Sequence, residues 1–156
     1  MERETVGRPM EILLVEDGLV DARLTIAALV KSGVKHRLTL VRDGVEALAF
    51  LNQEGVFARA PRPDLILLDL HLPKKDGHEV LDEVKADLEL KTIPIVVLTA
   101  SDDPDDKLKS ELLHVDSYLT KPVDYDKFLA VVRQLRKYWL NDIVLPKETA
   151  SGRSDK

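Results

Sequence analysis

Three short apolar runs constrain the fold more than any other feature of this chain. Residues 12–15, 65–68 and 95–98 are each entirely apolar, and each run is followed by a polar side chain. Runs of this length are typical of strands buried on both faces of a parallel sheet, although a buried helix could also produce them. Residues 38–41 and 117–120 are weaker strand candidates. The sequence therefore predicts up to five strands.

Helical patterns follow these runs. Gly33 suits the end of a helix, whereas Asp43 and Asp124 suit helix N-caps. A further helix is expected to begin at Pro104, after an acidic pair. Alternation of strand and helix predicts an α/β fold, a doubly wound parallel sheet with helices on both faces. Apolar residues recur at helical spacing in five places: Val20, Leu24 and Ala27; Val45, Leu48 and Ala49; Val80, Leu81 and Val84; Leu108, Leu112 and Val115; and Phe128, Val131, Leu135, Tyr138 and Trp139.

Composition narrows the class of protein. The 156 residues contain no cysteine, which excludes disulfides and thiolate chemistry. A net charge of −5 disfavours non-specific binding to nucleic acid or to an anionic membrane. No apolar run approaches the length of a membrane span, and residues 1–8 do not resemble a signal peptide, so a cytoplasmic location is expected. We expect a flexible N-terminus over residues 1–9, one domain over 10–146 and a disordered tail over 147–156.

The residues that end the predicted strands carry the chemistry. In an open parallel sheet, ligands bind beyond the carboxyl ends of the strands. Those ends bring Glu16 and Asp17, Asp69, Thr99 and Lys121 to one edge. Crowded carboxylates need a cation, and oxygen ligands favour Mg²⁺. One carboxylate could then attack phosphorus, while the hydroxyl and the ammonium group bind phosphoryl oxygens.

Each of these residues also has a simpler interpretation. Glu16 and Asp17 could merely cap the next helix. A lone Asp69 would most often begin a loop, and Lys121 alone would be solvated surface. The acidic run at 102, 103, 105 and 106 is better read as favourable charge at a helix N-terminus than as a second metal site. The four histidines show no ligand spacing.

Taken together, the motifs resemble those of response-regulator receivers. The resemblance covers residues 10–140 and rests on V-E-D at 15–17, D-L-H-L-P-K-K-D-G at 69–77, V-L-T-A at 97–100 and Y-L-T-K-P at 118–122. It implies a flavodoxin-like sheet with strand order 2-1-3-4-5. It also implies a protein that turns over only its own phosphate. The resemblance implies Asp69 as phosphoacceptor, and Asp17, Asp69 and the His71 backbone carbonyl as Mg²⁺ ligands, supported by Glu16. It further implies Lys121 and Thr99 as phosphate-binding groups, Tyr118 as the switching aromatic and a cis bond before Pro122.

This chain departs from the family pattern at two positions, and two other classes of protein compete with the resemblance. Gly18 stands where a polar residue is common in the family, and His71 occupies a variable position that tunes the phosphoryl lifetime. Haloacid-dehalogenase phosphatases also place a nucleophilic Asp after an apolar strand, but they need a second acid where this chain has His71. A nucleotide-binding module is disfavoured because no glycine-rich phosphate loop is present.

A more specific resemblance, to one group of small regulators, indicates a partner for this chain. The segments at 49–57, 60–77 and 138–146 are similar to those of small regulators that partner phytochrome histidine kinases. About 16 residues follow Leu140, too few for a DNA-binding domain, so we expect output through protein contacts. A phosphorelay intermediate for another kinase or a regulator of motility is the main alternative within signalling.

The aromatic residues suggest self-association. Five of the seven aromatics lie between 118 and 139. On a helical wheel, the apolar stripe that contains Phe128, Tyr138 and Trp139 is wider than one core-facing side requires, which predicts a homodimer through the C-terminal helix. In the alternative, residues 143–146 fold back and cover the excess within one chain.

Overall fold

A five-stranded parallel sheet forms the centre of the computed structural model, which describes residues 7–100, 115–139, 143 and 145–146. The strand order is β2-β1-β3-β4-β5, as the family resemblance implies. All five apolar or half-apolar runs are strands, each one or two residues longer than the run that predicted it. Their bounds are β1 Met10–Val15, β2 His36–Val41, β3 Leu65–Asp69, β4 Ile95–Ala100 and β5 Ser117–Lys121.

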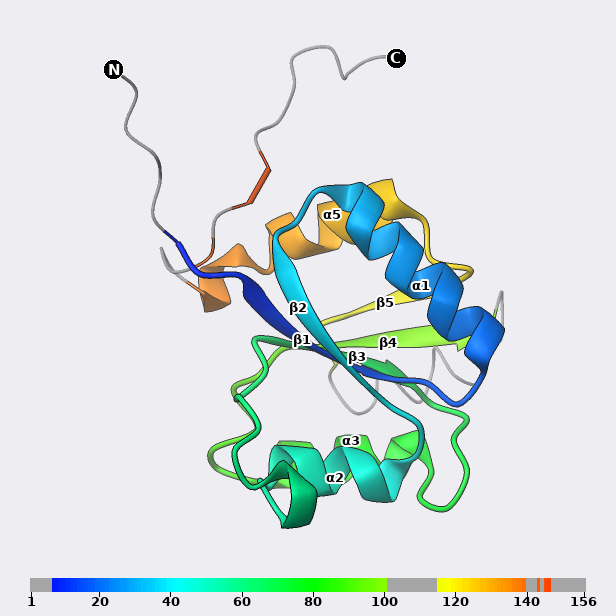
Figure 1. The fold of residues 1–156 in the computed structure, drawn as a ribbon, viewed down its shortest axis with the longest axis vertical. Helices are drawn as coiled ribbons and strands as arrows, with labels where there is room; N and C mark the ends of the chain where they lie inside the picture. The colour runs from blue at the N-terminus through cyan, green and yellow to red at the C-terminus, as the bar shows by residue number, and fades with distance from the viewer. Residues whose placement is uncertain (1–6, 101–114, 140–142, 144, 147–156) are drawn as a thin grey trace.

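Helices cover both faces of the sheet (Figure 1). On one face lie α1 (Leu19–Ser32) and α5 (Tyr125–Gln134), and on the other lie α2 (Gly44–Leu51) and α3 (Gly77–Ala86). Two short 3₁₀ turns, η1 (Gly55–Phe57) and η2 (Arg136–Tyr138), follow α2 and α5. The doubly wound α/β architecture predicted from the sequence is therefore confirmed.

Helix ends follow the expected capping chemistry. The side chain of Asp43 accepts a hydrogen bond from the Glu46 amide at 2.7 Å, and Asp124 accepts one from Lys127 at 3.1 Å. Gly33 ends α1 with φ of 83°, a left-handed conformation that suits glycine. These three predictions are confirmed. The helix expected at Pro104 and the neighbouring acidic run lie outside the described residues.

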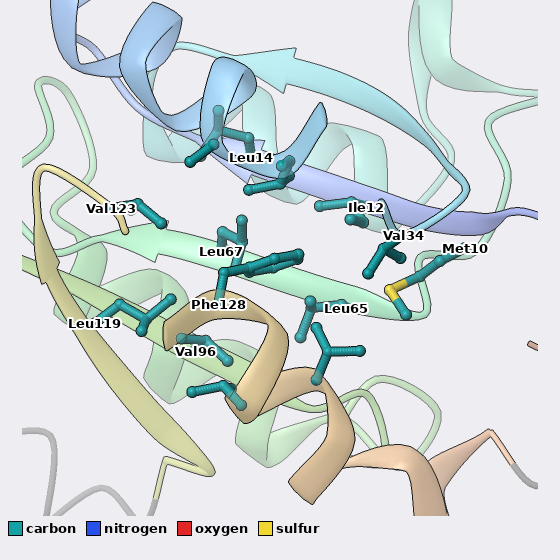
Figure 2. Close-up of a cluster of buried hydrophobic side chains, with 14 of the residues drawn as sticks. Met10, Ile12, Leu14, Val34, Leu65, Leu67, Val96, Leu119, Val123 and Phe128 are labelled. Carbon is teal, nitrogen blue, oxygen red and sulfur yellow. The ribbon is translucent and has the colours of Figure 1, made fainter. Parts of the chain in front are cut away.

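The sheet separates two apolar cores. One lies under α2 and α3, and the other lies between the sheet and α1 and α5. Figure 2 shows the second core, where Phe128 projects from α5 toward Leu65 and Leu67 of β3. Phe128 is fully buried. None of the helices in the described part of the chain is long and apolar enough to cross a membrane.

The segment after α5 folds back on the same chain. Trp139 is 6% exposed, and its indole nitrogen donates to the Asp64 carbonyl at 2.8 Å. Ile143 is buried and bridges to Arg8, and Leu145 packs against the core of α1 and α5. Arg8, which lies in the predicted flexible N-terminus, also pairs with Asp64 through two contacts of 2.6 Å. Residues 7–9 and the end of the described chain therefore belong to the folded unit.

This packing corrects the argument for a dimer. Phe128 and Trp139 are core residues of a single chain, so they do not form an unpartnered surface stripe. Tyr138 is 41% exposed and donates to Asp116 at 2.6 Å. The helical wheel overestimated the exposed apolar surface because residues 143 and 145 cover part of it. A dimer remains a prediction, but these two residues no longer support it.

Candidate functional site

The carboxyl ends of the strands meet at one edge, as the sequence predicts. Val15 pairs with Leu68 across β1 and β3, and Asp69 pairs with Leu98 across β3 and β4. Thr99 pairs with Thr120, one residue before Lys121. This register brings Glu16, Asp69, Thr99 and Lys121 together.

Lys121 forms the centre of the site. Its ammonium group lies 3.2 Å from Oε1 of Glu16, 3.1 Å from Oδ2 of Asp69 and 3.1 Å from Oδ2 of Asp21. Glu16 and Asp69 are almost completely buried. Three carboxylates therefore share one cation, and the cluster carries an excess of negative charge.

Burial and charge shift the ionisation of this cluster. Burial, assisted by the nearby charge of Asp69, raises the pKa of Glu16 to about 7 despite the attraction of Lys121. Burial by itself would lower the pKa of Lys121, but the charge of Asp69 and the hydrogen bonds to Asp21 and Asp69 raise that pKa above its usual value. The lysine therefore stays protonated near neutral pH. Glu16 is poised to ionise when further positive charge arrives.

The loop after β3 positions Asp69. The His71 amide donates to Oδ1 of Asp69 at 3.0 Å, which leaves Oδ2 facing Lys121. At the end of the loop, Asp76 caps the start of α3 with a capping box. Gly77 follows, and a Cβ there would lie 2.4 Å from the Asp69 carbonyl oxygen. Only glycine allows this close approach without a shift of the backbone at the site.

Thr99 and Tyr118 flank the cluster. Thr99 is fully buried, and its hydroxyl has no hydrogen-bond partner among the described residues. A buried hydroxyl without a partner costs free energy, so its presence favours a state in which it gains one. Tyr118 is half-buried against the core of α2 and α3. The Lys121–Pro122 peptide bond is cis.

The predicted metal ligands are only partly assembled. The Asp17 side chain is exposed, and among the described residues no three acidic or histidine side chains lie close enough to hold a metal ion. The donor set nevertheless fits a hard divalent cation, because buried Glu16 and Asp69 offer oxygen only and their charge is incompletely balanced. Lys121 supplies part of the positive charge that balances these carboxylates.

Sequence reasoning missed Asp21. This residue lies in the first turn of α1, and its carboxylate contacts Lys121. Its place just after β1, at the same edge as Glu16 and Asp17, was the available signal. No pattern of spacing connected it with a lysine 100 residues away.

Comparison with known proteins agrees with this geometry. The response regulator receiver domain family matches residues 12–133. Response regulator Rcp1 of Synechocystis sp. is 49% identical over 138 residues, which cover 88% of this chain and 94% of Rcp1.

Two solved structures are similar throughout. The Mn²⁺-bound form of response regulator Rcp1 has 48% identity and a TM-score of 0.69, with 89% of this chain and all of that chain covered. The phosphorylated cyanobacterial phytochrome response regulator RcpA has 49% identity and a TM-score of 0.71, with 90% of this chain and all of that chain covered. The shared fold, the strand-end residues and the family match lead to one conclusion: this chain belongs to the response-regulator receiver family.

Proposed function

We propose that this protein is a response regulator that accepts a phosphoryl group on Asp69 from a histidine kinase. The observation that carries the proposal is the placement of Asp69, whose Oδ2 lies at the buried end of β3 beside Lys121 and Glu16. In the transfer, Oδ2 attacks the phosphorus of a phosphohistidine. A P–O bond forms, the P–N bond breaks, and its electron pair returns to the imidazole nitrogen.

The acidic residues would hold Mg²⁺ for this reaction. We assign the ligands to the carboxylates of Asp17 and Asp69 and to the carbonyl of His71, with Glu16 supporting the ion. Oxygen donors around an excess of negative charge support this assignment, as does the similarity to the Mn²⁺-bound form of Rcp1. When bound, the ion neutralises charge on the phosphoryl oxygens. Asp17 must turn inward from its exposed position.

Thr99 and Tyr118 would convert phosphorylation into a conformational signal. An acyl phosphate on Asp69 offers oxygen atoms to the unpartnered hydroxyl of Thr99, and Tyr118 would move toward the space that Thr99 vacates. A shift from 1:99 to 99:1 requires about 5.5 kcal/mol. One charge-assisted hydrogen bond contributes roughly 1.5–3 kcal/mol, so Lys121 and the metal must contribute the rest.

The family implies a histidine kinase as the partner, and the phytochrome response regulator RcpA points to a kinase of the phytochrome class. A phosphorelay with a different kinase is the alternative. We expect signalling through phosphorylation-dependent protein contacts without nucleic acid or membrane binding. Turnover of the protein's own phosphate alone, a cytoplasmic location and a homodimer remain predictions.

Phosphotransfer to an altered acceptor tests the proposal. Asp69→Asn keeps the shape of the side chain but removes the nucleophile, so transfer from a phosphorylated histidine kinase should fall to background. Asp82→Asn, at an exposed position of α3, is the matched control and should accept phosphate normally. Transfer to Asp69→Asn at the wild-type rate would overturn the assignment.

Small phosphomonoesters separate a switch from a phosphatase. Wild-type protein should hydrolyse them no faster than background, because His71 stands where a phosphatase of the dehalogenase class needs an acid. Multiple turnovers that disappear in Asp69→Asn would instead assign an enzymatic function.

A further inference from the structure

Asp21 is a third carboxylate on Lys121 that none of the assigned roles uses. It extends from the first turn of α1, and its Oδ2 lies 3.1 Å from the lysine nitrogen. The Asp21 side chain is 42% exposed, whereas those of Glu16 and Asp69 are 2% and 6% exposed. Asp21 is therefore the solvent-side member of the cluster.

The Lys121 ammonium has no donor to spare. It carries three N–H groups, and three carboxylate oxygens surround it at 3.1–3.2 Å. When Oδ2 of Asp69 bonds to phosphorus, its hydrogen bond from Lys121 can pass to a phosphoryl oxygen, but a second phosphoryl oxygen can gain one only if Glu16 or Asp21 releases the lysine. The contact with exposed Asp21 is the cheapest to release, because buried carboxylates lose much more when they are left unpaired.

We propose that Asp21 is a positioning residue that competes with the phosphoryl group for Lys121 and so destabilises the phosphorylated state. This inference rests on the proposed function and deepens it. In the unphosphorylated protein Asp21 holds one N–H of the lysine on the α1 side of the site. A second hydrogen bond from Lys121 to the phosphoryl group requires that bond to be given up.

Repulsion acts in the same direction as competition. The Asp21 carboxylate and a phosphoryl group are both negative, and both approach the same ammonium group. Removal of the Asp21 charge should therefore favour the phosphorylated state. The same removal should disfavour Mg²⁺ binding, because it lowers the negative charge of the site.

Asp21 has a simpler possible role as favourable charge at the start of a helix. Asp126 allows the two roles to be separated. It also lies in the first turn of a helix, α5, is exposed, and forms no ion pair with the residues that the structure describes. Asp126→Asn therefore removes the same helix-dipole interaction without affecting Lys121.

The experiment titrates beryllium trifluoride, an anion that mimics a phosphoryl group on aspartate, into full-length protein at saturating Mg²⁺. Isothermal titration calorimetry should give Asp21→Asn a roughly two- to fivefold tighter affinity than wild type, the fold-change that corresponds to an exposed ion pair. A separate titration with MgCl₂ alone should give this variant a weaker Mg²⁺ affinity. Asp126→Asn should match wild type in both titrations, and Asp21→Glu should restore wild-type behaviour.

Opposite changes in the two affinities are the signature of competition, because a purely structural defect would weaken both or neither. Unchanged or weaker beryllium trifluoride binding in Asp21→Asn, while wild type binds, would overturn this inference and leave the proposed function intact. If wild type itself bound no beryllium trifluoride, the proposed function would fail, and the inference would fail with it.

Discussion

The two edges of the sheet both contain ion pairs, but they are built differently. At the carboxyl edge one lysine serves three carboxylates, two of them buried. At the opposite edge one carboxylate, Asp64, receives two hydrogen bonds from Arg8 and one from the Glu11 amide. Its backbone carbonyl receives the indole N–H of Trp139.

The difference indicates what each edge does. Asp64 has its charge balanced and its oxygens occupied, so this edge joins the N-terminal segment, β3 and the segment after α5. The carboxyl edge keeps an excess of negative charge around Glu16 and an unpartnered hydroxyl on Thr99. Such an arrangement lowers the stability of the fold. Proteins retain arrangements of this kind where a bound ligand completes the site.

Removal of metal should produce the largest difference in effect between the two edges. In excess chelator, phosphoryl transfer to Asp69 should fall to background, because the negative cluster then repels the incoming phosphoryl group. The fold should persist, since the edge around Asp64 needs no metal. Transfer assays measure the loss of phosphoryl transfer, and circular dichroism on the same samples measures whether the fold persists. Transfer at the wild-type rate in chelator would mean that the cluster is not a metal site.

The opposite edge should affect stability without affecting chemistry. Trp139→Ala should reduce the free energy of unfolding by about 3–5 kcal/mol, because it leaves a cavity and deprives the Asp64 carbonyl of its donor. Urea denaturation measures the loss, and Trp139→Phe should recover much of it. The initial rate of phosphoryl transfer should be unchanged at a temperature where the variant is folded. A slower rate there would show that the two edges are coupled.

Glu16 should make stability depend on pH in buffer without divalent metal. Its pKa rises from 4.5 in the unfolded chain to about 7 in the folded protein. The folded state therefore binds the extra proton, and this contribution, on the order of 3 kcal/mol, is full below pH 4.5 and is lost as the pH rises through 7. The difference in unfolding free energy between wild type and Glu16→Gln isolates it. A constant difference over that range would contradict the assigned burial effect.

Thr99→Val tests the unpartnered hydroxyl. Valine keeps the shape but removes the oxygen, so the unphosphorylated protein should gain about 1–3 kcal/mol of stability. The variant should still accept phosphate yet respond weakly in partner binding. A loss of stability would mean that the hydroxyl already has a favourable environment, and an undiminished response would exclude Thr99 as the sensor.

Much of the fold could be predicted from the sequence because its signals are local. Apolar runs gave the strands, and Asp43, Asp124 and Gly33 marked helix ends. Because the predicted strands run parallel, their carboxyl ends place Glu16, Asp69, Thr99 and Lys121 at one edge. Assignment of the family also needed the motifs as a set, because each alone has a simpler interpretation.

The features that the sequence did not predict are contacts between residues that lie far apart in the chain. The contact between Asp21 and Lys121 depends on how α1 leaves the sheet, and no periodicity specifies that direction. The helical wheel of α5 likewise treated Trp139 as available for a partner. It could not show that Ile143 returns to Arg8 and that the indole reaches Asp64.

We propose that acceptance of a phosphoryl group by Asp69 completes the carboxyl edge of the sheet. The most direct test of this proposal is to phosphorylate the wild-type protein with acetyl phosphate and Mg²⁺, reduce the product with borohydride and map the peptides by mass spectrometry. Reduction converts an aspartyl phosphate to homoserine. We expect homoserine at position 69 and at no other aspartate. Homoserine at Asp17 or Asp21, or unmodified Asp69 in protein that has gained a phosphoryl group, would contradict it.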